Sequence, residues 1–243
     1  MISVIIPCYN AAKYIEQAIE SVLKQDIEKE IIIIDDCSID HTANILQNYL
    51  VQENVTIHTN VQNLGVAASR NLGVKLARGE YIAFLDADDY WAEDKLKKQI
   101  KELQKGNGVF SYTARRLITE DGEVMNKVIP VHTICTYEML VRHNEITCSS
   151  VLMKKEIATE FLMKHDNVHE DYLTWLRVLK KYGAACGINE PLLNYRLSEN
   201  GKSRNKIKSA KMTYGVHRYM GDGKWKSFRY TLFHLLEGLK KYR

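Results

Sequence analysis

No apolar run in this sequence of 243 residues approaches the roughly 18 to 20 consecutive apolar residues of a membrane-spanning helix. The opening stretch MISVIIPCYN also lacks the basic start and the small-residue cleavage site of a secretory signal peptide. We therefore expect a cytoplasmic protein. The length suits one main α/β domain with an appendage.

Cysteines are few and scattered. The chain has five, with no CxxC pair and no histidine at zinc-binding spacing: Cys8, Cys37, Cys135, Cys148 and Cys186. This pattern indicates neither a disulfide framework nor a structural metal site. We expect reduced and mostly buried thiols.

Three common motifs are also missing. No GxGxxG follows the first apolar run, and no GxSxG occurs. The stretch NGKS at 200–203 lacks the upstream glycine and the strand-to-helix setting of a phosphate-binding P-loop. These absences exclude dinucleotide enzymes, P-loop ATPases and serine hydrolases.

Charge is distributed unevenly around a net value of +4. Residues 201–243 contain 12 Lys or Arg but only two acidic residues, Asp222 and Glu237, so this tail carries +10. The first 200 residues have 22 basic and 28 acidic side chains and carry −6. A basic appendage on an acidic body suggests an anionic partner, with membrane lipid, nucleic acid and an acidic acceptor as alternatives.

The first 85 residues alternate between short β-branched runs and segments with helical spacing of apolar residues. Such alternation predicts a mostly parallel sheet covered by helices on both faces. Strands are expected at 2–6, 30–35, 55–59 and 81–85, and helices at 12–24, 40–50 and 65–77.

Further along the chain, the pattern loosens. A hairpin with Asp121 and Gly122 in its turn is expected within 109–124, followed by helices at 136–142 and 170–182. No linker or internal repeat separates the two halves, so one fold should extend to about residue 200. A polar mobile loop and a terminal helix should follow.

Polar and acidic residues follow three of the predicted strands. PCYN ends the first, DDCSID follows the second, and DADD, with Asp86, Asp88 and Asp89, follows the fourth. Ligands of open α/β sheets bind outside the carboxyl ends of the strands. Crowded carboxylates repel one another unless a cation neutralises them, and carboxylate oxygens suit Mg²⁺ or Mn²⁺, which bridges phosphates. The pattern predicts a site for a cation and a diphosphate.

Each feature also has a simpler interpretation. Asp88 or Asp89 could cap a helix that begins near Ala92, and Asp40 could cap the helix after the second strand. Tyr9 could be a packing residue and Arg70 a surface charge. The convergence of all these features on one crevice favours a binding site.

Five motifs together resemble family 2 glycosyltransferases of the GT-A fold: SVIIPCYN, DDCSID, NLGVAASRNLG, GEYIAFLDADD and HEDYLTWLRVLKKYG. The resemblance covers about residues 1–200. It implies a Rossmann-like, mostly parallel sheet flanked by helices, in which residues 1–110 bind a nucleotide-sugar and residues 111–200 shape the acceptor site. Residues 201–243 would then form a basic loop and an amphipathic C-terminal helix.

The resemblance also implies roles for individual residues. Tyr9 lies against the base, Asp36 contacts the uracil, and Arg70 assists. The DxD motif consists of Asp86 and Asp88, with Asp88 as the direct ligand of Mn²⁺ or Mg²⁺. The full set of nucleotide-binding residues is Pro7, Tyr9, Asn10, Asp36, Arg70, Asp86 and Ala87.

HED at 169–171 matches the family's catalytic base, with Asp171 as the base and Glu170 beside it. Inverting transfer requires the acceptor hydroxyl to lose its proton as it attacks the anomeric carbon, and a positioned carboxylate accepts that proton. The alternative is an acidic first turn that the helix dipole favours.

The sequence departs from the family pattern in three places. Cys37 replaces the glycine of the DDGS turn, so it must adopt a backbone geometry that suits glycine better. No QxxRW occurs, which favours addition of one sugar per encounter. The late loop YRLSENGKS lacks the family's histidine; Arg196, Lys202 and Arg204 could contact phosphates there or remain solvated charges.

We therefore expect a UDP-sugar donor, a glycan or lipid-linked glycan acceptor in bacterial surface-glycan assembly (lipopolysaccharide, capsule or exopolysaccharide), and no nucleic-acid partner. Apolar residues from Trp225 to Leu239 form one helical stripe with basic flanks, which either lies on the inner face of an anionic membrane or docks on the body. The alternatives are a phosphohydrolase of the haloacid dehalogenase type, whose nucleophile would follow the first strand, and a non-catalytic module that binds a nucleotide-sugar or nucleic acid.

Overall fold

The computed structural model describes residues 1–106, 108–197 and 205–241. Its first part alternates strands and helices as the sequence predicts, up to a fourth strand. The strands are β1 (Ile2–Cys8), β2 (Lys29–Asp35), β3 (Val55–Thr59) and β4 (Tyr81–Phe84). The helices between them are α1 (Ile15–Leu23), α2 (Thr42–Gln47) and α3 (Val66–Leu76).

The second part contains strands of very different length, from two residues in β5 to 13 in β10, and the longest helices. Its strands are β5 (Tyr90–Trp91), β6 (Phe110–Ile118), β7 (Val124–Ile129), β8 (Ile134–Thr136), β9 (Leu152–Lys154) and β10 (Ala184–Arg196). Its helices are α4 (Lys95–Gln104), α5 (Tyr137–Leu140), the 3₁₀ helix η1 (Cys148–Ser150), α6 (Lys155–Glu160), α7 (Glu170–Tyr182), α8 (Lys206–Tyr219) and α9 (Lys224–Lys241).

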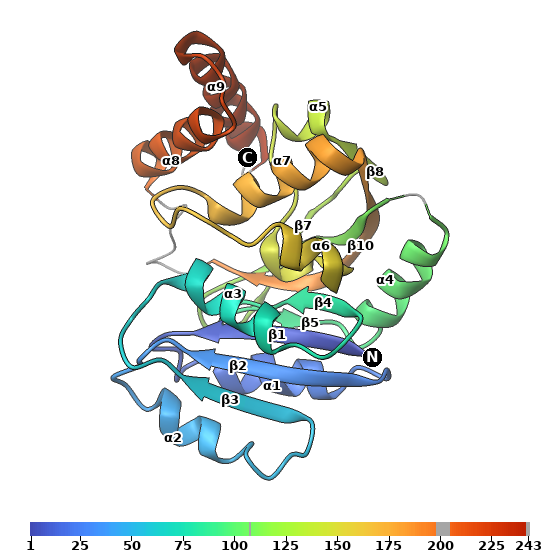
Figure 1. Ribbon diagram of the computed structural model, residues 1–243, viewed down its shortest axis with the longest axis vertical. Helices are drawn as coiled ribbons and strands as arrows, with labels where there is room; N and C mark the ends of the chain where they lie inside the picture. The colour runs from blue at the N-terminus through green and yellow to red at the C-terminus, as the bar shows by residue number, and fades with distance from the viewer. Residues whose placement is uncertain (107, 198–204, 242–243) are drawn as a thin grey trace.

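All the strands join one sheet in the order β3-β2-β1-β4-β9-β6-β10-β5, with β7 on β6 and β8 on β10 (Figure 1). The four strands β3, β2, β1 and β4 are parallel, and so are β6 and β10. Between these two sets, β9 runs antiparallel to both β4 and β6. The expected α/β fold is thus confirmed. Its sheet is parallel over the first four strands and mixed beyond them, and β9 joins the two halves.

Helices cover both faces of this sheet, which explains the nearly continuous burial of its first strands. Side chains of α1 and α4 pack with one face of β1 and β2 in one apolar cluster. The opposite faces of these strands pack with α3 and α7 in a second cluster. Residues on both sides of a strand are therefore shielded from water, and isoleucine suits both faces.

The β6–β7 hairpin is confirmed, and Gly122 in its turn has φ of 90°. The capping interpretation of Asp88 and Asp89 is wrong, because the next helix begins only at Lys95, after Asp94. Helix α8 begins at Lys206, within the segment where a polar loop was expected, so this part of the prediction is wrong.

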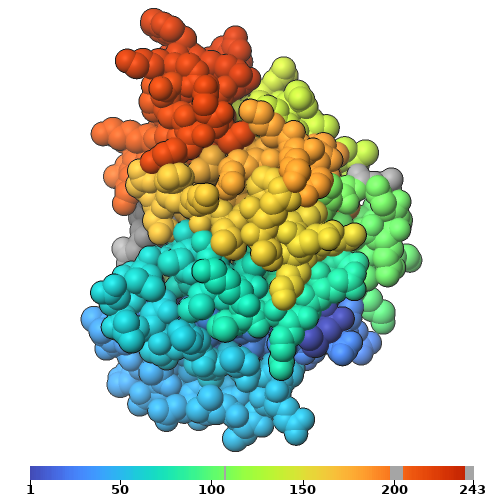
Figure 2. Space-filling view, viewed as in Figure 1, coloured from blue at the N-terminus to red at the C-terminus, as the bar shows by residue number. Residues whose placement is uncertain are grey.

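Helices α8 and α9 form a hairpin that stands at one end of the molecule, opposite α2 and β3 (Figures 1 and 2). The expected C-terminal helix is therefore present. None of the helices within the described ranges is both long and apolar enough to cross a membrane.

Helix α3 lies so close to β1 that Gly73 has no room for a side chain. An added methyl group would overlap Cγ2 of Ile5, which is completely buried. We predict that Gly73→Ala lowers the free energy of unfolding by about 1 to 3 kcal/mol, because overpacking outweighs the better helix propensity of alanine. Urea unfolding monitored by circular dichroism measures the change.

The matched control is Gly238→Ala in α9, where an added methyl group meets no atom within 4 Å. This variant should be neutral or stabilised by up to about 1 kcal/mol. Equal effects of the two substitutions would show that packing against Ile5 is not the reason for the glycine.

Candidate active site

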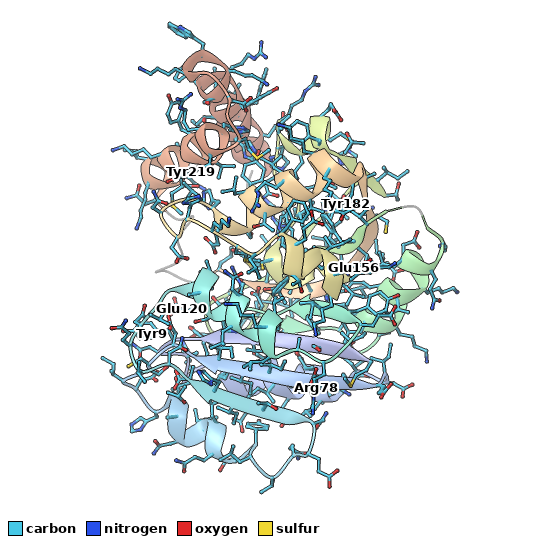
Figure 3. All side chains as sticks on the ribbon, in the orientation of Figure 1. Tyr9, Arg78, Glu120, Glu156, Tyr182 and Tyr219 are labelled. Carbon is cyan, nitrogen blue, oxygen red and sulfur yellow. The ribbon has the colours of Figure 1, made fainter. Side chains whose placement is uncertain are left out.

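The polar residues that follow β1, β2 and β4 meet at one edge of the sheet. Parallel pairing brings Cys8 of β1 level with Asp35 of β2, so the segments after both strands begin side by side. Tyr9 is 48% exposed at this edge. Figure 3 shows Tyr9 and Glu120 on the side toward which β1 to β3 point, away from Arg78. The structure thus gathers the predicted strand-end residues, with Pro7 buried inside β1 itself.

Reciprocal hydrogen bonds hold the segment after β1 against the segment after β2. The backbone nitrogen of Asn10 donates to Oγ of Ser38 at 2.9 Å, and Oδ1 of Asn10 accepts from the nitrogen of Ile39 at 2.9 Å. Asn10 and Cys37 both have positive φ, at 50° and 66°. The glycine-like geometry expected of Cys37 is therefore confirmed.

Asp36 orders the entrance to α3. Its carboxylate is 3% exposed and accepts hydrogen bonds from Nδ2 of Asn60 at 2.7 Å and from the backbone nitrogens of Leu64 at 2.9 Å and Gly65 at 2.8 Å. Three donors fix the carboxylate and also the loop that leads into α3. The contact with uracil implied for Asp36 stays a prediction.

Arg70 is a buried cation between two carboxylates. Its side chain extends from α3, where it is 5% exposed, and is therefore not a surface charge. Nη2 donates to Oδ1 of Asp86 at 2.5 Å, and Nη1 donates to Oε1 of Glu170 at 2.9 Å. One guanidinium thus joins the turn after β4 to the first turn of α7.

The turn after β4 carries more negative charge than its surroundings neutralise. Asp86 remains 30% exposed and its backbone nitrogen donates to Oγ of Ser149 at 3.0 Å. Burial, followed by repulsion from Asp86, raises the pKa of Asp88 to about 6. Burial and the charge of Asp88 raise the pKa of Asp89 well above its usual range. The excess charge is what a bound cation would relieve.

Arg196 clamps the same turn from the other side. It is 4% exposed, and its Nε donates to the carbonyl oxygen of Asp88 at 2.8 Å, while its backbone nitrogen donates to Oδ1 of Asp89 at 2.9 Å. Its remaining nitrogens donate to carbonyls of the β6–β7 turn and to Gln17. Arg196 is therefore buried and fully bonded, not a solvated loop charge. Lys202 and Arg204 lie outside the described residues.

The first turn of α7 presents two acids in different environments. Glu170 is buried against Arg70, whereas Asp171 is partly exposed and its Oδ1 accepts from the nitrogen of Tyr172 at 2.7 Å. Burial, followed by the neighbouring charge of Glu170, raises the pKa of Asp171. A raised pKa makes a carboxylate a better proton acceptor.

Two further residues, Ser149 and Asp166, support the site although no sequence motif indicates them. Ser149 holds the turn after β4, as described above, and Oδ1 of Asp166 accepts from the nitrogen of Ala67 in the first turn of α3 at 3.1 Å. Asp166 and Ala67 are 99 positions apart in sequence. No local pattern signals such a contact, because the fold alone brings these segments together.

The side chains of this site could supply only one or two ligands to a metal ion. No group of three or more His, Cys, Asp or Glu side chains suited to a metal occurs in the part of the chain that the structure describes. Magnesium commonly takes one or two protein carboxylates and completes its coordination with phosphates and water. Asp86 and Asp88, with their unneutralised charge, fit that role.

Sequence comparisons identify the family and several relatives of this chain. A family model described as glycosyl transferase family 2 matches residues 3–162. A Bacillus subtilis glycosyltransferase assigned to teichuronic acid biosynthesis is 40% identical, covering 90% of this chain and 87% of the relative. An Escherichia coli protein named UDP-Glc:alpha-D-GlcNAc-diphosphoundecaprenol beta-1,3-glucosyltransferase is 33% identical, covering 100% of this chain and 95% of the relative.

Solved structures share the fold at low sequence identity. Staphylococcus aureus TarS in complex with UDP-GlcNAc matches with a TM-score of 0.74 and 18% identity, covering 95% of this chain and 70% of that one. A mannosyltransferase of Pyrobaculum calidifontis in complex with GDP-Man and Mn²⁺ matches with a TM-score of 0.70 and 18% identity, covering 96% and 69%.

The charge crowding after β4 predicts a pH-dependent effect of Asp88→Asn. The folded pKa of about 6 lies above the unfolded value of about 3.9, so the Asp88 carboxylate destabilises the fold increasingly as pH rises from about 4 to 6. In EDTA, Asp88→Asn should raise the free energy of unfolding at pH 8 by about 1 to 3 kcal/mol and leave it unchanged near pH 4.

Denaturant titrations at both pH values measure this difference. Asp26→Asn serves as the control, because the Asp26 side chain is 95% exposed and should respond little at either pH. A gain for Asp88→Asn of equal size at pH 4 and pH 8 would contradict the electrostatic explanation.

Proposed function

This chain belongs to glycosyl transferase family 2, and we propose that it moves one sugar from a UDP-sugar, with inversion, to a hydroxyl group of a lipid-linked glycan. That the chain is a glycosyltransferase follows from the family match and from its relatives. The observation that carries the finer proposal is the bridge from Asp86 through Arg70 to Glu170. This bridge supports a diphosphate site at the turn after β4, close to Asp171 as the proposed base.

We assign donor binding to the edge formed after β1, β2 and β4. Exposed Tyr9 offers a ring for the nucleobase, while Asn10 and Asp36 order the surrounding loops. Pro7, Arg70 and Ala87 complete the proposed nucleotide site. UDP is favoured because the Escherichia coli relative is named for UDP-Glc and TarS was solved with UDP-GlcNAc.

Inversion follows from a single displacement with Asp171 as the base. An oxygen of the acceptor hydroxyl forms the new bond to the anomeric carbon, its proton passes to the Asp171 carboxylate, and the bond to UDP breaks with its electrons on the diphosphate. The Escherichia coli relative makes a β linkage by name. Because glucose is α-linked in UDP-glucose, a β product requires inversion.

We propose Asp86 and Asp88 as the residues that hold Mn²⁺ or Mg²⁺. When bound, the ion would offset the negative charge that grows on the departing diphosphate. Arg70 and Arg196 fix the turn that carries both carboxylates, so the chain itself sets where they stand. The Pyrobaculum calidifontis structure, with the same fold, contains Mn²⁺.

We place the reaction at the cytoplasmic face of the membrane, in the assembly of a surface glycan such as lipopolysaccharide, capsule or exopolysaccharide. The names of two relatives support this, one through its diphosphoundecaprenol acceptor and the other through teichuronic acid. Family membership argues against the phosphohydrolase and binding-module alternatives.

Nucleotide binding tests the donor assignment. We predict that UDP with Mn²⁺ binds at least about tenfold more tightly than UDP with EDTA, since removal of the cation leaves the diphosphate facing the carboxylates. GDP and CMP should bind at least about tenfold more weakly than UDP, because an edge that recognises uracil leaves polar groups unpaired with another base. Isothermal titration calorimetry measures all four. Equal binding of the three nucleotides would refute the uracil assignment.

The role of Asp171 is tested by Asp171→Asn. Loss of the base should reduce turnover by about 10² to 10⁴ while UDP affinity stays within about threefold. Turnover is measured with a panel of UDP-sugars and a synthetic GlcNAc-diphospholipid acceptor.

Asp94→Asn, which alters the residue just before α4, is the matched control and should keep full turnover. Comparable losses in both variants, or loss of UDP binding in Asp171→Asn alone, would count against a base.

A further inference from the structure

Helix α9 attaches to the body of the protein through small and polar side chains. Ser227 is completely buried and Thr231 is 7% exposed. Nε2 of His234 lies 2.9 Å from the hydroxyl oxygen of Tyr172 on α7. The small residues allow α9 to approach the body closely. Because Ser227, Thr231 and His234 all form hydrogen bonds, this face forms an internal contact and needs no further partner.

The opposite face of α9 is bulky, apolar and exposed. Its residues recur at spacings of three, four and seven, which places most of them on one stripe. They are Trp225 (87% exposed), Phe228 (58%), Leu232 (45%), Phe233 (42%), Leu235 (38%) and Leu236 (48%). We call this set the outer face. A helix of a water-soluble body normally turns such a stripe inward, and an exposed apolar patch of this kind marks a contact with something else.

Basic side chains border the outer face. Lys224, Lys226 and Arg229 are all exposed on the first turns of α9. Lys226 pairs with Asp222 at 2.7 Å yet keeps 47% of its side chain in solvent. The whole segment 201–243 carries a charge of +10. The partner should therefore offer an apolar layer beneath an anionic surface.

We propose that the outer face of α9 enters the headgroup layer of an anionic membrane, with Lys224, Lys226 and Arg229 against lipid phosphates. An amphipathic helix with apolar aromatic and leucine residues and basic flanks binds lipid in this way. This proposal adds a membrane-binding surface to the cytoplasmic membrane location proposed above. Only the choice of the cytoplasmic leaflet rests on that proposed function. The evidence for membrane binding is the orientation of α9, whose apolar residues face solvent while Ser227 and Thr231 are buried.

A second copy of the chain is a poorer partner for this surface. In a twofold dimer the same patch meets itself, so the basic border of one copy would face the basic border of the other. Like charges in such contact repel, whereas lipid phosphates neutralise them. Charge therefore favours a membrane over self-association.

The position of α8 links this surface to the proposed base. Nε2 of His169, directly before Glu170 and Asp171, lies 3.1 Å from Oγ of Ser209 on α8. His165 stacks on Tyr219 of α8 with ring centroids 3.8 Å apart. The hairpin that meets the lipid is thus bonded to the segment that presents Asp171. Attachment through α9 would hold this segment near the membrane, where a lipid-linked acceptor is presented.

Vesicle flotation with the full-length protein tests the proposal. We expect binding to phosphatidylcholine vesicles that contain phosphatidylglycerol and at least about tenfold weaker binding to phosphatidylcholine alone. The double variant Phe228→Gln/Leu232→Gln should lose at least about tenfold of the anionic binding, because it removes apolar insertion. Lys224→Gln/Arg229→Gln should weaken binding only to the anionic vesicles.

Leu50→Gln/Val51→Gln is the matched control, since both residues are exposed and apolar but lie at the far end of the molecule, next to β3. It should bind vesicles like the wild type. All variants should keep the wild-type Tm and UDP affinity, which shows that they are folded.

Failure of the wild type to bind anionic vesicles, or undiminished binding by Phe228→Gln/Leu232→Gln, would overturn the proposal. A wild-type dimer that this variant converts to a monomer, without vesicle binding, would assign the outer face to self-association instead. Vesicle binding without UDP binding would leave this proposal intact and refute the proposed donor.

Discussion

The buried guanidinium of Arg70 is the interaction on which the site depends. It stands between Asp86 and Glu170, and so ties α3, the turn after β4 and α7 around one charge. Removing one member of a buried ion pair typically costs about 3 to 5 kcal/mol, because the remaining charge is uncompensated. Since Glu170 adjoins Asp171, this cation couples the geometry of the turn after β4 to that of the first turn of α7.

Arg196 completes the support, but in a different way. Arg70 neutralises a carboxylate, whereas Arg196 bonds mainly to carbonyl oxygens and to Asp89 through its backbone nitrogen. The two arginines fix the shape of the acidic turn without cancelling all of its charge. The raised pKa of Asp88 and of Asp89 reflects the negative charge that remains unneutralised. A turn fixed in this way, with surplus negative charge, suits the metal ion that we propose for Asp86 and Asp88.

The sequence predicted those parts of the molecule that rest on local patterns. The strands and helices up to β4, the β6–β7 hairpin, α7 and the strand-end acids all follow from periodicity and turn residues. It missed the features that arise from pairing over long distances. Strand β9 is too short to show a period, and the buried role of Arg196 depends on a turn 108 residues earlier. The sequence predicted the apolar stripe on α9, but not whether this stripe faces solvent or the body of the protein.

The stripe faces outward because the opposite side of the α8–α9 hairpin carries the small and polar side chains that pack against the body. Ser227 and Thr231 are small and buried, so α9 can lie close to the elements it packs against. The imidazoles of His217 and His234 both contact the hydroxyl group of Tyr172. Burial lowers the pKa of both histidines, to about 4 and about 3, so they remain uncharged in this contact at neutral pH. Because the inner face is already satisfied by packing and hydrogen bonds, turning the leucines inward would break it. The apolar stripe of α9 therefore stays exposed as long as the hairpin is docked. Through the contact between His169 and Ser209 of α8, this exposed surface can orient the rest of the chain.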